Sequence, residues 1–267
     1  MLGAIIGDLV GSRFEYRNCR SKDFELFNEK CFPTDDSIMS LAIAQAILIS
    51  NSDYSDLQEN TIKCMQELGR KYPHCGYGGS FHRWIFSDNP TPYNSYGNGA
   101  SMRVSSIGFI ANSLEESKKL SKIVTEVSHN HLEGIKGAES VSVAIYMARN
   151  GYNISEIKDY INKNYYSINF TLNEIRNNYG FNETCQGTVP QAFQAFFESK
   201  SFEDAIRNVI SIGGDSDTLA AICGGIAEAY YGIPMNIREK ALTFLDSRLK
   251  KILISFENKY PPIIKRQ

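Results

Sequence analysis

The chain has 267 residues, of which 42% are hydrophobic and 22% are charged, and its formal net charge is −2. These proportions are ordinary for a globular domain with a substantial core. A charge this close to zero gives no electrostatic reason to expect a stable nucleic-acid partner or a membrane surface as a partner. The longest apolar stretch, residues 38–49, is interrupted by Ser40 and Gln45 and is too short to span a bilayer.

The N-terminal residues do not have the pattern of a secretion signal, because no basic segment precedes the apolar stretch and Asp8 falls inside it. The six cysteines are scattered, without the C-x-x-C spacing of a structural zinc site. A chain of this size needs no disulfides, so we expect reduced thiols in a cytoplasmic protein. We also expect the chain to act as a monomer.

Helix-type spacing of apolar residues accounts for most of the chain, and alternating strand patterns are nearly absent. The spacing and the caps predict helices over residues 2–11, 34–50, 55–70, 101–111, 115–128, 133–149, 154–164, 189–198, 202–211, 217–231 and 237–257. Residues 18–33 and 74–101 are predicted to be loops, residues 165–187 have no clear pattern, and residues 258–267 are predicted to be an extended tail. The sequence therefore predicts one all-α domain over residues 1–267.

A short segment near the C-terminal end, Gly213 to Thr218, carries two carboxylates directly before an apolar helix. Asp215 and Asp217 are separated by one serine, and the hydroxyl of Thr218 follows the second of them. By itself this pattern is most simply a helix cap, with Asp217 as the N-cap and Asp215 in the turn. Two fixed carboxylates repel each other, however, unless a cation or a cluster of backbone N–H groups lies between them.

The segment Thr34-Asp35-Asp36-Ser37 has the same features at the start of another apolar helix. Its own simplest interpretation is again a cap, with negative charge near the positive end of the helix dipole. Two such segments suggest a shared site, since hard oxygen ligands of this kind suit Mg²⁺, Mn²⁺ or Ca²⁺. Together they offer enough oxygens for two divalent cations, which could hold hydroxyl or phosphate oxygens and activate water.

Two glycine-rich segments, residues 76–80 and 97–99, lie between these acidic segments, with aromatic residues between them. Their backbone N–H groups could cradle a pyrophosphate, and the aromatic rings could stack on a base. Neither is a Walker loop or a Rossmann fingerprint, so turns and core packing are the simpler interpretation. A salt bridge or a cap is likewise the simpler role for Glu15 or Asp8, and a structural role is the simpler one for His129.

Taken in order along nearly the whole chain, these segments resemble the ADP-ribosylglycohydrolase family, which includes dinitrogenase-reductase-activating glycohydrolase and the vertebrate ADP-ribosyl-acceptor hydrolases. The resemblance is carried by Gly7-Asp8 through Glu15, Thr34-Asp35-Asp36-Ser37, Gly76-Tyr77-Gly78, Gly97 to Arg103, Ser128-His129 and Gly213 to Thr218. It implies an all-α orthogonal multi-helix bundle with a binuclear Mg²⁺ or Mn²⁺ cleft. The implied activity is metal-dependent hydrolysis of the glycosidic or ester bond at C1″ of ADP-ribose. Its substrate would be an ADP-ribosylated protein, nucleic acid or small molecule.

The resemblance also implies a role for each matching residue. The metal ligands would be Thr34, Asp35, Asp36, Asp215, Asp217 and Thr218. Either Glu15 or Asp36 would be the general base. The substrate would be bound by Gly76, Gly78, Tyr96, Gly97, Asn98, Gly99, Met102, Arg103 and His129. The segment from Cys185 to Pro190 would face the leaving group, and the identity of the acceptor stays open.

Two other functions fit the same residues. One is a two-metal phosphoesterase that acts on a nucleotide. The other is a non-catalytic relative that binds ADP-ribose. Every acid of the family pattern is present, which favours an active hydrolase. AMP rather than ADP-ribose among the products would indicate the phosphoesterase, and tight binding of ADP-ribose without turnover would indicate the non-catalytic relative.

Overall fold

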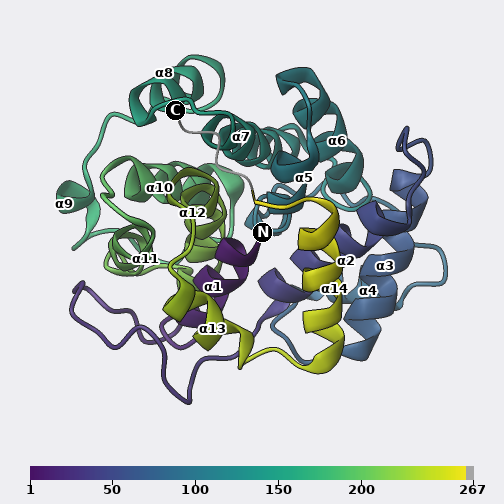
Figure 1. Cartoon of the computed structure of the whole chain (residues 1–267), viewed down its shortest axis with the longest axis horizontal. Coiled ribbons are helices and arrows are strands. Elements are labelled where there is room, and N and C mark those ends of the chain that lie inside the picture. The colour runs from purple at the N-terminus through teal and green to yellow at the C-terminus, as the bar shows by residue number, and fades with distance from the viewer. Residues whose placement is uncertain (263–267) are drawn as a thin grey trace.

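A computed structural model describes residues 1–262, which form helices joined by loops and contain no strand (Figure 1). The α-helices are α1 (Leu2–Gly11), α2 (Asp35–Ile49), α3 (Leu57–Lys71), α4 (Gly79–Phe86), α5 (Ser105–Ile110), α6 (Leu114–Glu126), α7 (Leu132–Arg149), α8 (Ile154–Asn164), α9 (Leu172–Ile175), α10 (Cys185–Phe197), α11 (Phe202–Ile210), α12 (Ser216–Tyr231), α13 (Met235–Leu242) and α14 (Ser247–Lys259). A short 3-10 helix, η1, covers Asn98–Ala100. The predicted all-α fold is confirmed.

The helices α1 and α12 pack closely against each other at the centre of the molecule (Figure 1). All residues of α1 are buried. A Cβ atom at Gly7 would lie 1.9 Å from the carbonyl oxygen of Ala220, so only glycine allows the two backbones to come this close. One helical turn later, a Cβ atom at Gly11 would lie 2.5 Å from the Cα atom of Asp217. The end of α1 therefore lies directly against the start of α12.

Helix α2 packs against α1 and α12, and it is also covered by α3 and α14. Because it has neighbours on several sides, most of its residues are buried, and its sequence is apolar over most of the helix rather than along one stripe. The packing of α2 against α1 and α12 places the start of α2 close to the start of α12.

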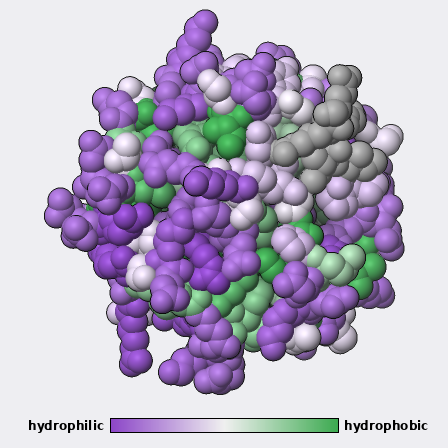
Figure 2. Space-filling view, turned by 60° about the vertical axis from the view of Figure 1, so that its left-hand side comes forward, coloured by the Kyte–Doolittle hydropathy of each residue, from purple (hydrophilic) through white to green (hydrophobic). Residues whose placement is uncertain are grey.

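The outer surface differs from this apolar centre. On the face drawn in Figure 2, hydrophilic residues predominate and hydrophobic residues are exposed in separate patches. Within residues 1–262, no helix combines the length and the apolar character needed to cross a membrane. The six cysteines are free.

The prediction of a loop over residues 74–101 is wrong for residues 79–86, which form α4. Phe81, Trp84 and Ile85 are buried at helical spacing on this helix. The pattern is only about two turns long, and glycines before it and prolines after it favour a loop interpretation.

The helix predicted over residues 101–111 begins only at Ser105. The preceding residues form turns, because the N–H groups of Ser101 and Met102 donate to the carbonyl oxygen of Asn98. The helix predicted over residues 189–198 begins earlier, at Cys185, where the hydroxyl of the preceding residue Thr184 caps it.

The single helix predicted over residues 237–257 is in fact two helices, α13 and α14. Asp246 separates them, because its side chain caps α14 by accepting from two backbone N–H groups. Helix α14 continues to Lys259, so the predicted extended tail is wrong at residues 258 and 259. The part of that tail at residues 263–267 lies outside the described residues.

Candidate active site

The two acidic segments predicted from the sequence meet where the starts of α2 and α12 approach each other. The hydroxyl of Thr218 donates to Oδ2 of Asp36 over 3.3 Å, and Oγ1 of Thr34 lies 3.3 Å from the same oxygen. Because α1 packs against both α2 and α12, these two segments lie side by side although they are far apart in the sequence. The segments therefore form one cluster rather than two separate caps.

Two groups of three acids within the described residues have carboxylate oxygens that lie within 4.8 Å of one another. The first contains Asp8, Asp36 and Asp217, and the second contains Glu15, Asp215 and Asp217. Asp217 belongs to both groups. Charges of one sign at this spacing in a buried region repel strongly, unless protons or cations compensate them.

The electrostatics of the cluster fit a divalent cation. Burial, followed by repulsion from Asp217, raises the pKa values of Asp35, Asp36 and Asp215 well above their usual range. The same two causes raise the pKa of Glu15 to about 7. The Oδ1 atom of Asp36 is buried and has no hydrogen-bond partner within residues 1–262. A hard cation would satisfy this oxygen and offset the repulsion, so the donor set fits Mg²⁺ or Mn²⁺.

The start of α12 differs from the simplest cap interpretation of the sequence. Asp215, not Asp217, is the N-cap residue, and its side chain makes no capping hydrogen bond. Its Oδ2 atom instead accepts from Nδ2 of Asn98 at 2.7 Å. Gly213 and Gly214 have φ values of +67° and +81°, a conformation that favours glycine, and they turn the chain so that this carboxylate joins the cluster.

A cavity of about 670 Å³ opens over the acids. All the sequence-predicted site residues line it except Tyr96, namely Glu15, Thr34, Asp35, Asp36, Gly76, Gly78, Gly97, Asn98, Gly99, Met102, Arg103, His129, Asp215, Asp217 and Thr218. The ring of Tyr96 is 44% exposed and packs against His131 instead, with ring centroids 5.1 Å apart.

Another part of the cavity lining has the opposite charge. Arg103 is fully buried and makes no ion pair within the described residues, and only Nη2 has a close partner, the hydroxyl of Ser128 at 2.7 Å. Its Nε and Nη1 atoms have no hydrogen-bond partner there. Burial lowers the pKa of Arg103 to about 10, so the group remains charged at neutral pH. Burial and the neighbouring Arg103 lower the pKa of His129 well below its usual value, which keeps the imidazole neutral.

A buried cation with free donors beside a cavity favours an anionic ligand group, and the acidic cluster favours cations. The sequence profile described as ADP-ribosylglycohydrolase matches residues 1–255. The chain belongs to the ADP-ribosylglycohydrolase family. The resemblance predicted from the motifs is thereby confirmed.

Several known proteins are similar to this member of the family. It is 24% identical to ADP-ribosylhydrolase ARH3 of Homo sapiens, over 87% of this chain and 84% of that protein. It is 23% identical to ADP-ribosylhydrolase ARH3 of Gallus gallus, over 87% of this chain and 84% of that protein. A solved structure of an ADP-ribosylglycohydrolase-related protein complex has a TM-score of 0.68 at 20% identity, and the match covers 96% of this chain and 95% of that one. At this identity the structural match shows that the fold is shared.

The mouth of the cavity contains residues that the sequence did not point to. Tyr16 is 84% exposed, and its ring stacks with that of Phe181 at a centroid distance of 6.3 Å. Glu183 also lines this part of the chain's cavity. The segment expected to face the leaving group, Cys185 to Pro190, forms the start of α10 and is not among the residues that line the cavity. The only sequence signals were the position of Tyr16 next to Glu15 and the polar, aromatic composition of residues 165–187.

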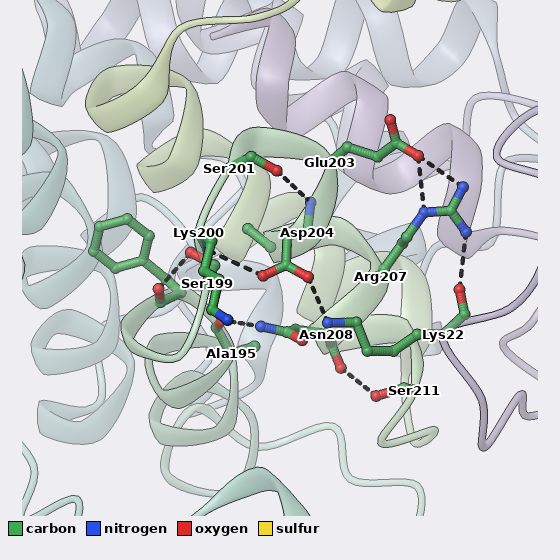
Figure 3. Close-up of polar contacts among 12 residues, drawn as sticks. Lys22, Ala195, Ser199, Lys200, Ser201, Glu203, Asp204, Arg207, Asn208 and Ser211 are labelled. Carbon is green, nitrogen blue, oxygen red and sulfur yellow. Dashed lines mark hydrogen bonds and ion pairs between the residues drawn. The ribbon is translucent and has the colours of Figure 1, made fainter.

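The loop after α1, which carries Glu15, is tied to the rest of the molecule. Asn18 donates from Nδ2 to the carbonyl oxygens of Glu15 and Gly214, both at 3.0 Å, and its Oδ1 accepts from the N–H of Gly214 at 2.9 Å. Farther along the loop, Figure 3 shows Lys22 paired with Asp204 of α11. These contacts hold Glu15 near the start of α12, although the sequence of this loop predicts only an exposed segment.

Proposed function

We propose that this protein is a metal-dependent ADP-ribosyl hydrolase, which cleaves the bond between C1″ of ADP-ribose and an acceptor and releases ADP-ribose. The observation that carries this proposal is the two-sided character of the cavity. Acids suited to cations line it, and so does the cation of Arg103, which makes no ion pair within the described residues. ADP-ribose has the same polarity, with ribose hydroxyls at one end and a pyrophosphate farther along. The names of the ARH3 relatives support this reading.

We infer that two divalent cations, Mg²⁺ or Mn²⁺, are held by the oxygens of the two helix starts. The residues that would bind them are Thr34, Asp35, Asp36, Asp215, Asp217 and Thr218. When bound, such ions would hold the ribose hydroxyls and polarise a water molecule near C1″. The raised pKa values of Asp35, Asp36 and Asp215 support the inference, since each of these carboxylates gains from a nearby positive charge.

Glu15 is the better of the two predicted candidates for the general base. Glu15 lines the cavity and is only partly buried, so its carboxylate can reach a water molecule there, and burial raises its pKa toward the range that suits proton transfer near neutral pH. Asp36 is buried, and its Oδ2 atom already accepts from the hydroxyl of Thr218.

In the reaction, the oxygen of water would form a bond to C1″ while the bond from C1″ to the acceptor breaks. Glu15 would take a proton from the water, and the acceptor would leave with the electron pair of the broken bond and gain a proton. Nearby carboxylates would stabilise the positive charge that develops on the sugar.

The remaining predicted residues would bind the nucleotide part. Arg103 would attract a phosphate group by its charge. Its Nε and Nη1 atoms are buried and have no hydrogen-bond partner within the described residues, so they could donate to a phosphate oxygen after a small shift of the side chain. His129 stays neutral and packs against the rings of Phe81 and Tyr93, at centroid distances of 6.1 and 5.5 Å. These aromatic residues provide a rigid, partly apolar wall for the ligand.

The test is product analysis by mass spectrometry after the protein is incubated, in Mg²⁺ or Mn²⁺, with arginine-linked, serine-linked and nucleic-acid-linked ADP-ribose. We expect free ADP-ribose from at least one of these substrates and none from the Asp215→Ala variant. AMP as the product would select the phosphoesterase. Tight calorimetric binding of ADP-ribose without turnover of any substrate would select the non-catalytic relative.

A further inference from the structure

Asp8 is a buried carboxylate that belongs to the first of the two groups of acids but does not line the cavity. Its two oxygens accept four hydrogen bonds from the start of α2. The backbone N–H groups of Thr34 and Ser37 donate at 2.9 and 3.0 Å, the hydroxyl of Thr34 donates at 2.6 Å, and the hydroxyl of Ser37 donates as well. Three of these bonds go to Oδ2 and one goes to Oδ1, so the carboxylate is used mainly by the start of α2, although Asp36 and Asp217 are close neighbours.

We propose that Asp8 is a positioning residue, which orients the hydroxyl of Thr34 and fixes the start of α2 for cation binding. The inference rests on the proposed function, because it assigns a task toward the cations that the helix starts would hold. Asp8 belongs to α1 and is not among the residues that line the cavity.

The hydroxyl of Thr34 has a single proton, which can point to Asp8 or to Asp36. The Oγ1 atom lies 2.6 Å from Oδ1 of Asp8 but 3.3 Å from Oδ2 of Asp36, so the proton points to Asp8. The lone pairs of Oγ1 are then left facing the site, where one accepts from the N–H of Asp36. A hydroxyl whose proton points away from the site presents its lone pairs to a cation. Carboxylates that do not bind the cation themselves commonly orient its ligands in this way.

Asp8 also holds the backbone at the start of α2. Asp35 and Asp36 lie between Thr34 and Ser37, and Asp8 binds the N–H groups at both ends of this turn. These N–H groups have no partner of their own within α2, because they belong to its first turn. Asp8 thus fixes both predicted ligands relative to α1. The contact at Gly7 fixes α1 relative to α12, which carries the other half of the cluster.

The main test is the Asp8→Asn variant, with Mn²⁺ affinity measured by calorimetry in the absence of substrate. Asparagine keeps the size of the side chain but turns one acceptor oxygen into a donor, which opposes the donors of Thr34 and Ser37. We expect the dissociation constant for Mn²⁺ to rise about 10–100-fold, the usual cost of losing an outer partner of a ligand. The rate at which the Asp8→Asn variant releases ADP-ribose should recover in part when the Mn²⁺ concentration is raised by the same factor as the dissociation constant.

The matched control is Glu228→Gln. Glu228 is another buried carboxylate that binds α1, since it accepts from the N–H of Gly3 at 2.7 Å and pairs with the amine of Met1. It does not line the cavity. This variant should lower the melting temperature and leave the dissociation constant for Mn²⁺ unchanged.

If Asp8→Asn does not fold, the milder variant Ser37→Ala tests whether the contacts of Asp8 contribute to Mn²⁺ affinity. It removes one hydroxyl donor to Asp8, and we expect a loss of Mn²⁺ affinity of about 2–10-fold. If wild-type protein binds Mn²⁺ and the variants that fold bind it equally well, the role of Asp8 is purely structural and the inference is overturned. If wild-type protein binds neither Mn²⁺ nor Mg²⁺, the proposed function is overturned together with it.

Discussion

The hydroxyl of Thr218 donates to Oδ2 of Asp36 over 3.3 Å, although the two residues are 182 positions apart in the sequence. This contact joins the start of α12 to the start of α2. It depends on α1, whose glycines allow α12 to pack closely and whose Asp8 holds the start of α2. Residues 34–37 and 213–218, each of which has the sequence pattern of a helix cap, therefore form one acidic cluster beside a cavity.

Replacing Asp217 with Asn should affect activity and stability in opposite directions. Because both acidic groups share this residue, we expect ADP-ribose release to fall about 10³-fold or more, as cation contacts supply several kcal/mol to such reactions. The melting temperature of the cation-free protein should rise, since repulsion from Asp217 acts on Asp35, Asp36 and Asp215. Calorimetric melting in EDTA checks this, and a lower melting temperature for the variant would contradict the electrostatic explanation.

The cation-free protein should become less stable as the pH rises from about 5 to about 8. In the folded state the pKa of Glu15 is raised from 4.5 to about 7, and those of Asp35, Asp36 and Asp215 are raised as well. Between the unfolded and folded pKa values, the folded protein binds more protons than the unfolded chain. This contribution to stability is therefore complete below the unfolded values and is lost as the pH rises through the folded ones.

A cation that replaces these protons should restore the lost stability. The increase in melting temperature on adding Mn²⁺ should thus be larger near pH 8 than near pH 5, because the ligands must be deprotonated to bind. Thermal melts with EDTA or Mn²⁺ at both pH values measure this difference. An increase of the same size at both would show that the raised carboxylates are not the cation ligands.

Replacing Arg103 with Gln should weaken the binding of ADP-ribose by about 10–100-fold, which corresponds to losing charged hydrogen bonds. Mn²⁺ affinity should change far less, because Arg103 interacts with Asp35 only through space and makes no hydrogen bond or ion pair with the acids within the described residues. Arg83→Gln is the matched control, since Arg83 is exposed on α4 and donates to the Ser80 hydroxyl. Calorimetric titration with ADP-ribose decides the matter, and equal losses in both variants would point to bulk charge rather than to a phosphate contact.

The aromatic pair at the mouth of the cavity should act on the acceptor rather than on the nucleotide. Phe181→Ala should raise KM for an ADP-ribosylated protein by about 2–10-fold, the size of one aromatic contact. It should leave the affinity for free ADP-ribose unchanged. Phe86, which is 45% exposed and does not line the cavity, provides the control variant Phe86→Ala. A matching loss of affinity for free ADP-ribose would place Phe181 at the nucleotide instead.

The acidic segments could be predicted from the sequence because their residue types and positions carry the signal locally. Asp35 and Asp36, like Asp215 and Asp217, come directly before apolar helical patterns, and paired carboxylates at such positions suggest cations. The task of Asp8 could not be predicted in this way. Its partners are 26 and 29 residues away, and spacing along the chain does not show which donors a buried carboxylate meets in the fold.

The residues at the mouth of the cavity, Tyr16, Phe181 and Glu183, could not be predicted from sequence patterns for a related reason. Residues 165–187 have little regular structure, and their path depends on distant contacts, such as that from the N–H of Asn98 to the carbonyl oxygen of Glu183 at 2.7 Å. Tyr96 is the opposite case, a predicted site residue that does not line the cavity. It adjoins the glycine-rich segment at residues 97–99, but its backbone carbonyl binds the N–H of Cys185 and its ring packs on His131.

Anomalous diffraction from crystals of the protein soaked with Mn²⁺ and ADP-ribose tests the shared cation site most directly. We expect Mn²⁺ peaks held jointly by the segments at residues 34–36 and 215–218, with the ribose beside them and the pyrophosphate at Arg103. Cations found elsewhere, or no peak in this cluster at saturating Mn²⁺, would contradict a single cation site built from the two helix starts.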